Sequence, residues 1–181
     1  MKKRIHSDEI LNEVKIVENL NNIDNRGFFL KFYSREIKDN LNMDVTEVFY
    51  SRNKQNVIRG VHFQKSPGDL AKIIKCLDGL ILDFFIDLRK DSKTFGKFSS
   101  IELSSENNLS IYIPEGFGHG FSVLSQSATV IYLQSGEYNT ELEGGINPLS
   151  IDFNWRVENP IISERDRSHP SFQLDNNLFK L

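Results

Sequence analysis

The chain of 181 residues carries a formal net charge of −3, with 39% hydrophobic residues and no strongly basic stretch. This length suits one domain with a sizeable core, and the charge argues against a nucleic-acid or anionic-membrane surface. The single cysteine, Cys76, excludes an internal disulfide and is expected to be a small core residue. The basic start lacks the apolar run of a signal peptide, and no apolar stretch is long enough to span a bilayer, so we expect a cytoplasmic protein.

Residues 1–45 are expected to form an N-terminal segment of mixed structure. Residues 8–20 mix apolar positions with charged ones, which predicts a short helix turning into an edge strand. The sequence Asp-Asn-Arg-Gly at 24–27 is typical of a turn, and the aromatic run at 28–33 predicts a strand. A serine, a common N-cap residue, opens 34–41, where one or two helical turns are expected.

From Val45 onward the chain is predicted to form one short strand after another. Each is bounded by Gly, Pro, Asn, Asp or Ser, and they fall at 45–51, 57–63, 71–77, 80–88, 99–103, 109–113, 120–124 and 129–134. No helix-length crossover separates them, which favours an all-β jelly-roll barrel with short peripheral helices over a parallel α/β sheet. The whole chain is thus expected to be one domain with its barrel core at 46–140. In the C-terminal segment, 141–181, one more strand is expected at 149–155 and a packed loop at 160–163.

A first candidate site motif, Arg59-Gly60-Val61-His62-Phe63-Gln64, lies inside one of these strands. Side chains alternate between the two faces of a strand, so His62 and Gln64 are expected on one face and Arg59 on the other. Gly60 leaves space beside His62. A second glycine-punctuated run, Pro114 to Phe121, also contains a histidine, His119. The patterns H-x-Q and P-x-G-x-x-H resemble the two motifs of the cupin superfamily.

Further segments match one family of cupins from about residue 24 to residue 166. They are Asp24-x-Arg26-Gly27-x-Phe29, Arg59 to Gln64, Lys72, Gly79-x-x-x-Asp83, Asp87-Leu88-Arg89, Thr94-Phe95-Gly96, Leu103-Ser104-x-Glu106-Asn107, Ile113 to Phe121, Tyr132 with Tyr138, and Ser163-x-x-Asp166. On these motifs the chain resembles dTDP-4-dehydrorhamnose 3,5-epimerase and its relatives that act on nucleotide-linked 4-keto sugars. The resemblance implies a jelly-roll barrel and a cytoplasmic enzyme of surface polysaccharide sugar biosynthesis. It also implies a homodimer whose N-terminal strands, within 1–45, cross into the neighbouring subunit, and a site that needs no metal or cofactor.

The resemblance assigns a role to each matched residue. His62 would be the base that removes a proton beside the ketone, and Asp166 would orient and support its imidazole. Lys72 would face the developing enolate oxygen, and Tyr132 would return a proton to the opposite face of the sugar. Two arginines would hold the diphosphate, and the remaining matched residues would line the substrate pocket; these are Arg26 and Arg59, then Phe29, Gln64, His119 and Tyr138.

From the residues alone, each catalytic assignment has a structural alternative. His62 would then be a satisfied core or surface histidine, Asp166 a turn-capping aspartate, Lys72 a solvated lysine and Tyr132 a barrel aromatic. The family match favours the catalytic interpretation. Asp83, in an apolar strand, needs a partner, and a contact to a site residue and a purely structural hydrogen bond remain equally open.

The chain departs from the thymidine-sugar pattern at three positions. Lys31 stands where the family's first motif usually has an acid, and Glu47 and Phe49 stand where a glutamine and an asparagine are common. A carboxylate suits the N1–H and N2–H donors of guanine, and an ammonium suits its O6 and N7 acceptors. These residues favour a GDP-linked 4-keto 6-deoxy-hexose or heptose over a dTDP-linked sugar.

Three other functions stay open. A metal-dependent cupin needs about three histidines and a carboxylate, and His62-x-Gln64 offers an incomplete set. A 3-only epimerase or a ketoisomerase would share all the motifs, because pocket shape selects the carbon that reacts. A non-catalytic sugar-nucleotide-binding cupin would not need the base, acid, lysine and aspartate together.

Overall fold

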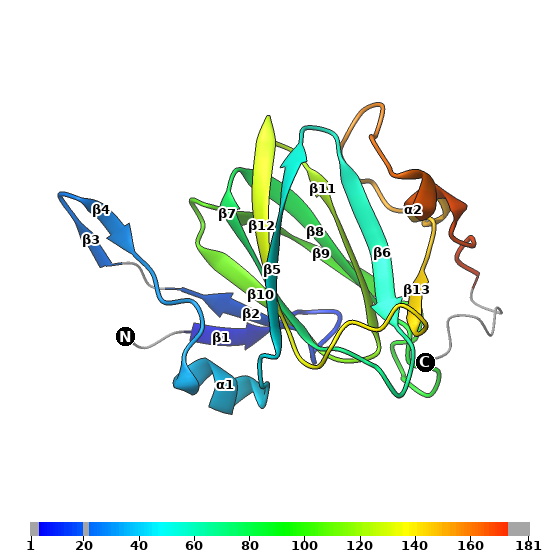
Figure 1. Ribbon diagram of the computed structural model, residues 1–181, viewed down its shortest axis with the longest axis horizontal. Helices are drawn as coiled ribbons and strands as arrows, with labels where there is room; N and C mark the ends of the chain where they lie inside the picture. The colour runs from blue at the N-terminus through cyan, green and yellow to red at the C-terminus, as the bar shows by residue number, and fades with distance from the viewer. Residues whose placement is uncertain (1–3, 20–21, 174–181) are drawn as a thin grey trace.

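Two antiparallel sheets face each other to form a barrel in the computed structural model, which describes residues 4–19 and 22–173 (Figure 1). The six-stranded sheet runs in the order β1 (Arg4–Ser7), β2 (Lys15–Glu18), β10 (Leu109–Ile113), β7 (Lys72–Asp78), β12 (Ser127–Gln134) and β5 (Glu47–Lys54). The five-stranded sheet runs in the order β13 (Glu143–Gly145), β6 (Ile58–Gln64), β11 (Phe117–Val123), β8 (Leu80–Asp87) and β9 (Phe98–Ser104). The all-β barrel is confirmed, and each strand predicted between residues 45 and 134 is present with its ends shifted by a few residues.

Three apolar clusters hold the two sheets and their coverings together. Neighbouring residues of β8 illustrate why, because Phe85 points into the barrel interior and Phe84 into a cluster on the outer face of its sheet. Trp155, from the C-terminal segment, covers that outer face. On the other sheet, α1 (Arg35–Leu41) buries Ile37 and Leu41 against the outer face. Burial on both faces gives β8 its nearly continuous apolar sequence.

The helix expected within residues 8–20 is wrong. The Asp8 carboxylate accepts hydrogen bonds from the backbone N–H groups of Ile10 and Leu11, which makes a turn at the point where a helix was expected. Leu11 then enters the barrel core, and β2 pairs with β10 to extend the sheet. Burial of Leu11 and Val14 in the core thus stabilises the turn and strand more than the weak helical pattern of this segment stabilises a helix.

The strand expected at 149–155 is also wrong. Its alternating apolar residues do pack on the outside of the five-stranded sheet, with Ile151 and Trp155 buried there. This segment starts with a 3-10 turn, η1 (Pro148–Ser150), in place of a strand. The carbonyl of Trp155 accepts a hydrogen bond from Ser122 Oγ and pairs with no strand. The segment therefore has the side-chain pattern of a strand without a strand partner for its backbone.

A two-stranded arm projects from the barrel on the N-terminal side (Figure 1). It consists of β3 (Asn22–Asp24) and β4 (Gly27–Phe29), so the strand expected at 28–33 ends early, at Phe29. Its Ile23, Phe28 and Phe29 side chains are exposed by 77%, 57% and 62%. The arm therefore presents an exposed apolar surface.

The helices are few and short. Besides α1, the described ranges contain the one-turn helix α2 (Glu164–Ser168), whose N-cap residue Ser163 accepts a hydrogen bond from the Asp166 N–H. No helix in residues 4–19 and 22–173 is long and apolar enough to cross a membrane.

Candidate active site

A cavity of about 420 Å³ opens between the two sheets. One wall comes from alternate residues of three adjacent strands, which therefore share a face: Glu47, Phe49 and Ser51 on β5, Tyr132 and Gln134 on β12, and Lys72 on β7. The facing wall comes from Arg59 and His62 on β6 with His119 and Phe121 on β11. This size lies within the range of small-molecule sites.

A bulge in β6 places Arg59 on the same side as His62. His119 of β11 pairs with His62 of β6, and Phe121 of β11 pairs with Arg59 of β6. Between these two pairs β11 advances by two residues and β6 by three. The extra residue in β6 reverses the alternation, so the prediction that Arg59 and His62 point to opposite faces is wrong. Both line the cavity, and Arg59 Nε donates to Asn53 Oδ1 at 2.5 Å.

The His62 imidazole is held by Asp166, as the resemblance implies. Its Nε2 lies 2.9 Å from Asp166 Oδ1, and the other carboxylate oxygen accepts the Gly60 N–H at 3.1 Å. Burial by itself raises the pKa of Asp166, but the bonds from His62 and Gly60 outweigh it and hold the pKa at about 2. In the tautomer that donates from Nε2 to Asp166, Nδ1 of the imidazole has a free lone pair.

Lys72, at the start of β7, brings an ammonium group to the cavity wall. Removal from water lowers its pKa to about 8, and the Glu143 carboxylate partly opposes this effect. The lysine is therefore charged at neutral pH and close to losing its proton in mild alkali.

This lowered pKa predicts an alkaline loss of activity. Lys72 carries its charge below pH 8 and loses it above, so kcat/KM should fall as the pH rises through about 8. In Lys72→Arg the guanidinium stays charged, and the falling limb should move to higher pH. If kcat/KM of the arginine variant still falls near pH 8, the loss is caused by the titration of another group.

Tyr132 lies flat against Phe49 across the strand pair. Their ring centroids are 4.9 Å apart with planes inclined by 16°, and the phenol oxygen is 3.5 Å from Ser51 Oγ. Burial raises the pKa of Tyr132 well above its usual range. The phenol therefore enters any reaction with its proton in place.

A second histidine–aspartate pair supports the cavity wall. His119 Nε2 lies 2.9 Å from Asp83 Oδ2, and Asp83 is fully buried. Burial raises the pKa of Asp83, while the neighbouring His119 lowers it. Asp83 therefore contacts a residue that lines the cavity, His119, which was one of the two alternatives left open for it.

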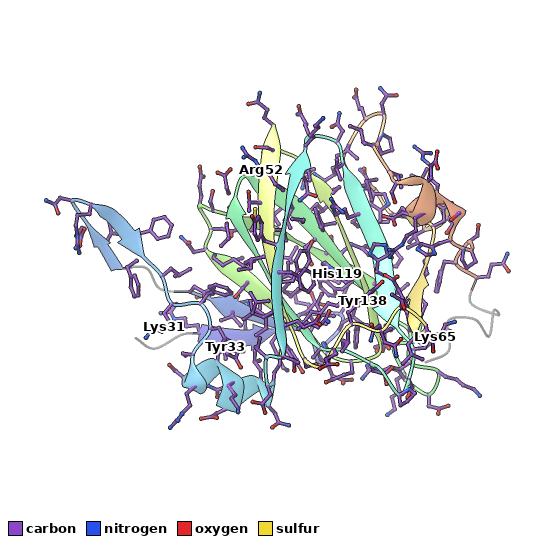
Figure 2. The ribbon with its side chains drawn as sticks, in the orientation of Figure 1. Lys31, Tyr33, Arg52, Lys65, His119 and Tyr138 are labelled. Atoms are coloured by element: carbon purple, nitrogen blue, oxygen red, sulfur yellow. The ribbon has the colours of Figure 1, made fainter. Side chains whose placement is uncertain are left out.

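Four predicted site residues lie elsewhere. Figure 2 shows Lys31 beside the arm, away from His119 and Tyr138. Arg26 and Phe29 are on the arm itself, where Arg26 pairs with Asp24. Lys31 and Glu47 are thus not together in one subunit. Gln64 is not among the residues lining the cavity and instead bonds the Gly68 carbonyl and the Asn139 N–H.

Several residues that line the cavity were not predicted from the sequence, among them Glu143, Arg165 and Gln134. The predicted Tyr138 donates to the Glu143 carboxylate at 2.5 Å, and Arg165 forms an ion pair with the same carboxylate. Gln134 donates to Glu47 at 3.0 Å. Its spacing of two residues from Tyr132 on one strand was a signal that both face the cavity.

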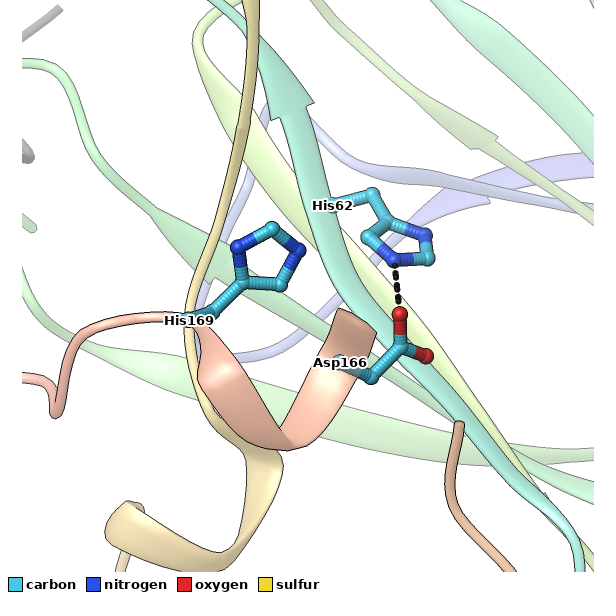
Figure 3. A group of neighbouring side chains, drawn as sticks. All are labelled: His62, Asp166 and His169. Carbon is cyan, nitrogen blue, oxygen red and sulfur yellow. Dashed lines mark hydrogen bonds and ion pairs between the residues drawn. The ribbon is translucent and has the colours of Figure 1, made fainter. Parts of the chain in front are cut away.

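His169 lies next to the His62–Asp166 pair, as Figure 3 shows. The His62 and His169 rings meet edge-on with centroids 5.9 Å apart. Burial and the neighbouring His62 lower the pKa of His169. Within residues 4–19 and 22–173, these three side chains form the one group of metal-ligating atoms close enough to hold an ion.

Comparisons with known proteins agree with the resemblance. A family model described as dTDP-4-dehydrorhamnose 3,5-epimerase matches residues 8–174. A dTDP-4-dehydrorhamnose 3,5-epimerase from Shigella flexneri is 35% identical over 154 residues, which cover 82% of this chain and 85% of the relative. A dTDP-4-dehydrorhamnose 3-epimerase from Streptomyces niveus is 34% identical over 151 residues, 80% of this chain and 72% of the relative. The structure of a dTDP-6-deoxy-D-glucose-3,5-epimerase from Legionella pneumophila in complex with dTDP-4-keto-L-rhamnose matches with a TM-score of 0.92 and 29% identity, covering 99% of this chain and 97% of that one.

Proposed function

Because the chain belongs to the dTDP-4-dehydrorhamnose 3,5-epimerase family, we propose that it inverts C3, C5 or both of a nucleotide-linked 4-keto sugar. The observation that carries this proposal is the placement of a base and an acid on facing walls of one cavity. His62, backed by Asp166, is on one sheet, and Tyr132 is on the other. Inversion needs this arrangement, because a proton leaves one face of the ring and another arrives on the opposite face.

The first step is removal of a proton from a carbon beside the ketone. His62 Nδ1 accepts that proton, and the electron pair of the C–H bond moves into an enolate whose charge falls on the C4 oxygen. The imidazole becomes a cation, which the ionised Asp166 stabilises at 2.9 Å. Lys72 supports the enolate oxygen with its positive charge, an interaction that is strongest once the charge has developed.

The second step returns a proton to the other face. Tyr132 keeps its proton in the resting enzyme, because burial raises its pKa. The enolate carbon is a strong enough base to take that proton. Before the next turnover, solvent returns a proton to the phenolate and takes one from the His62 imidazolium. Phe49 fixes the ring by stacking against it.

Two nucleotides are candidates for the substrate. The first candidate is dTDP, because the similar proteins are epimerases of dTDP-linked sugars. Guanosine is supported by the Glu47 carboxylate on the cavity wall and by Lys31, which would have to come from a neighbouring subunit. Phe49 stacks against Tyr132, so under this proposal it would lie near the reacting sugar and would have less part in recognising the nucleobase.

Proton NMR in heavy water tests the reaction and the nucleotide together. We expect the signal at C3, at C5 or at both to be lost from a dTDP-linked or GDP-linked 4-keto sugar, and the faster substrate identifies the nucleotide. Retention of both signals in every nucleotide-linked 4-keto sugar, with the protein folded and binding nucleotide, would favour a non-catalytic binding protein.

We also propose that the enzyme is a homodimer in which each arm completes the neighbour's site. Arg26 and Phe29 lie on an exposed apolar arm outside the cavity of their own subunit. Inside the cavity, Arg59 and Arg165 are the arginines among the lining residues, and Arg165 is paired with Glu143. A diphosphate with two negative charges is better held by a second free arginine, and Arg26 from a partner supplies it.

Mixing two damaged subunits tests this arrangement. Arg26→Ala and His62→Asn homodimers should each be slow, but in a mixed dimer one of the two sites has both residues. After subunit exchange, half of the dimers are mixed, so about a quarter of the sites should become active. A matched mixture of Arg59→Ala with His62→Asn should show no gain, because these two residues lie on the same barrel. No recovery in the Arg26→Ala mixture would place Arg26 in its own subunit's site.

A further inference from the structure

A buried nitrogen behind the proposed catalytic pair has no hydrogen-bond partner in the part of the chain that the structure describes. One ligand atom from each of His62, Asp166 and His169 lies within 4.8 Å of the others (Figure 3). The His169 Nε2 atom is buried and makes no hydrogen bond within the described ranges. Burial of an unbonded polar nitrogen is costly, so this atom is a candidate ligand for something that the three side chains share.

The surrounding chain holds the His169 ring in place. Gly145 on β13 has no side chain, and a Cβ at that position would overlap the ring. The carbonyl of Pro170, the residue after His169, accepts a hydrogen bond from the Asn147 N–H at 3.0 Å. The ring is therefore packed against β13 and is not a freely rotating surface side chain.

We propose that His62, Asp166 and His169 form a binding site for a divalent transition metal, with zinc as the best match. Two imidazole nitrogens and one carboxylate oxygen, with water as the fourth ligand, are a common zinc set. Zinc holds such ligands at about 2.0–2.2 Å, so two of them stand about 3.4 Å apart. His62 Nε2 and Asp166 Oδ1 are already 2.9 Å apart, so it is mainly the His169 imidazole that has to move closer when the ion binds. His62 and Asp166 also line a second, open hollow beside α2, which gives a route from solvent.

Metal at this site switches off the base by moving its proton. The ion occupies Nε2 of His62, the nitrogen that now shares a proton with Asp166. A neutral imidazole bound through Nε2 carries its one proton on Nδ1. That is the nitrogen that must be free to accept the substrate's proton. The metal therefore inhibits from behind the imidazole and leaves the substrate cavity open. This inhibition rests on the proposed role of His62, whereas metal binding itself does not.

The experiment measures binding and inhibition separately. Binding is followed by the visible absorption of Co²⁺ in the full-length protein, and inhibition by the exchange assay during titration with Zn²⁺. We expect one Co²⁺ per subunit with tetrahedral absorption bands, inhibition by Zn²⁺ that a chelator reverses, and full activity after exhaustive chelation. His169→Asn should keep its uninhibited rate and weaken both responses by about tenfold or more. The control His6→Asn alters an exposed histidine paired with Glu18 and should change neither response.

Each outcome decides the proposal. A His169→Asn protein with unchanged Zn²⁺ inhibition, or wild-type protein without the Co²⁺ bands, overturns the site. If the bands appear and require His169 but Zn²⁺ leaves exchange unaffected, the metal site stands and the role of His62 as the base fails. The wild-type Co²⁺ spectrum keeps the test valid even if His169→Asn does not fold.

Discussion

Replacing His62 by asparagine is expected to lower deuterium exchange into the substrate by at least about a hundredfold, the usual contribution of a general base. Asparagine keeps a hydrogen bond to Asp166 within reach but has no nitrogen that accepts a proton at neutral pH. The fold should be intact, because the His62 side chain is only partly buried and its neighbours keep their contacts. Exchange is measured by proton NMR in heavy water, with circular dichroism to check folding.

Tyr132→Phe is the matched comparison for this prediction. It removes one oxygen from the opposite wall and preserves the stacking on Phe49. If the tyrosine acts only as the acid, exchange through His62 should persist while inversion slows. Undiminished exchange in His62→Asn would remove that residue from the mechanism, and equal loss of exchange and inversion in Tyr132→Phe would argue against separate roles for the two walls.

The Gly60→Ala substitution is expected to lower the free energy of unfolding by about 3 kcal/mol or more. Gly60 has φ +113, a conformation that L side chains rarely adopt, and a Cβ there would lie 2.6 Å from Gly120 Cα and 2.7 Å from the His119 carbonyl oxygen. Both obstacles are backbone atoms of β11, so the two strands must separate to make room. Urea unfolding measures the loss, and exchange activity should fall with it, because β6 and β11 carry His62 and His119.

Gly27→Ala provides the control for backbone strain. Gly27 has a similar φ of +123, but nothing lies within 4 Å of its added Cβ. This variant should show the cost of the strained backbone alone, and a clearly smaller loss than Gly60→Ala. Equal losses at the two glycines would mean that close approach of the strands contributes nothing.

The barrel was predictable because its strands follow local rules. Most are short apolar runs between turn residues, and their pairing preserves the alternation that the sequence displays. The two failures have different causes. At 8–20 a single Asp8 side chain organises a turn, and at 149–155 the apolar residues pack on a sheet whose edge is already occupied by β13.

The site was predictable in composition but not in all of its geometry. The family resemblance identified His62, Lys72 and Tyr132, which the structure brings to one cavity. The side on which Arg59 lies depends on a bulge in the pairing of β6 with β11, between the His119 and Phe121 pairs, and strand periodicity cannot reveal that. His169 belongs to no motif, and it reaches His62 only because the C-terminal segment folds back over β6.

The His62–Asp166 bond also sets the order in which a functional molecule is assembled during synthesis. The two residues are 104 positions apart, and all strands of the six-stranded sheet are complete once Gln134 has been made. Domains fold as the chain emerges from the ribosome, so most of the barrel can close before α2 exists. A nascent chain that stalls between Gln134 and Asp166 would have the cavity and the imidazole but no carboxylate to hold it. Under the proposed mechanism, catalysis begins only when the C-terminal segment docks against β6, where the Ile58 N–H donates to the Ile161 carbonyl.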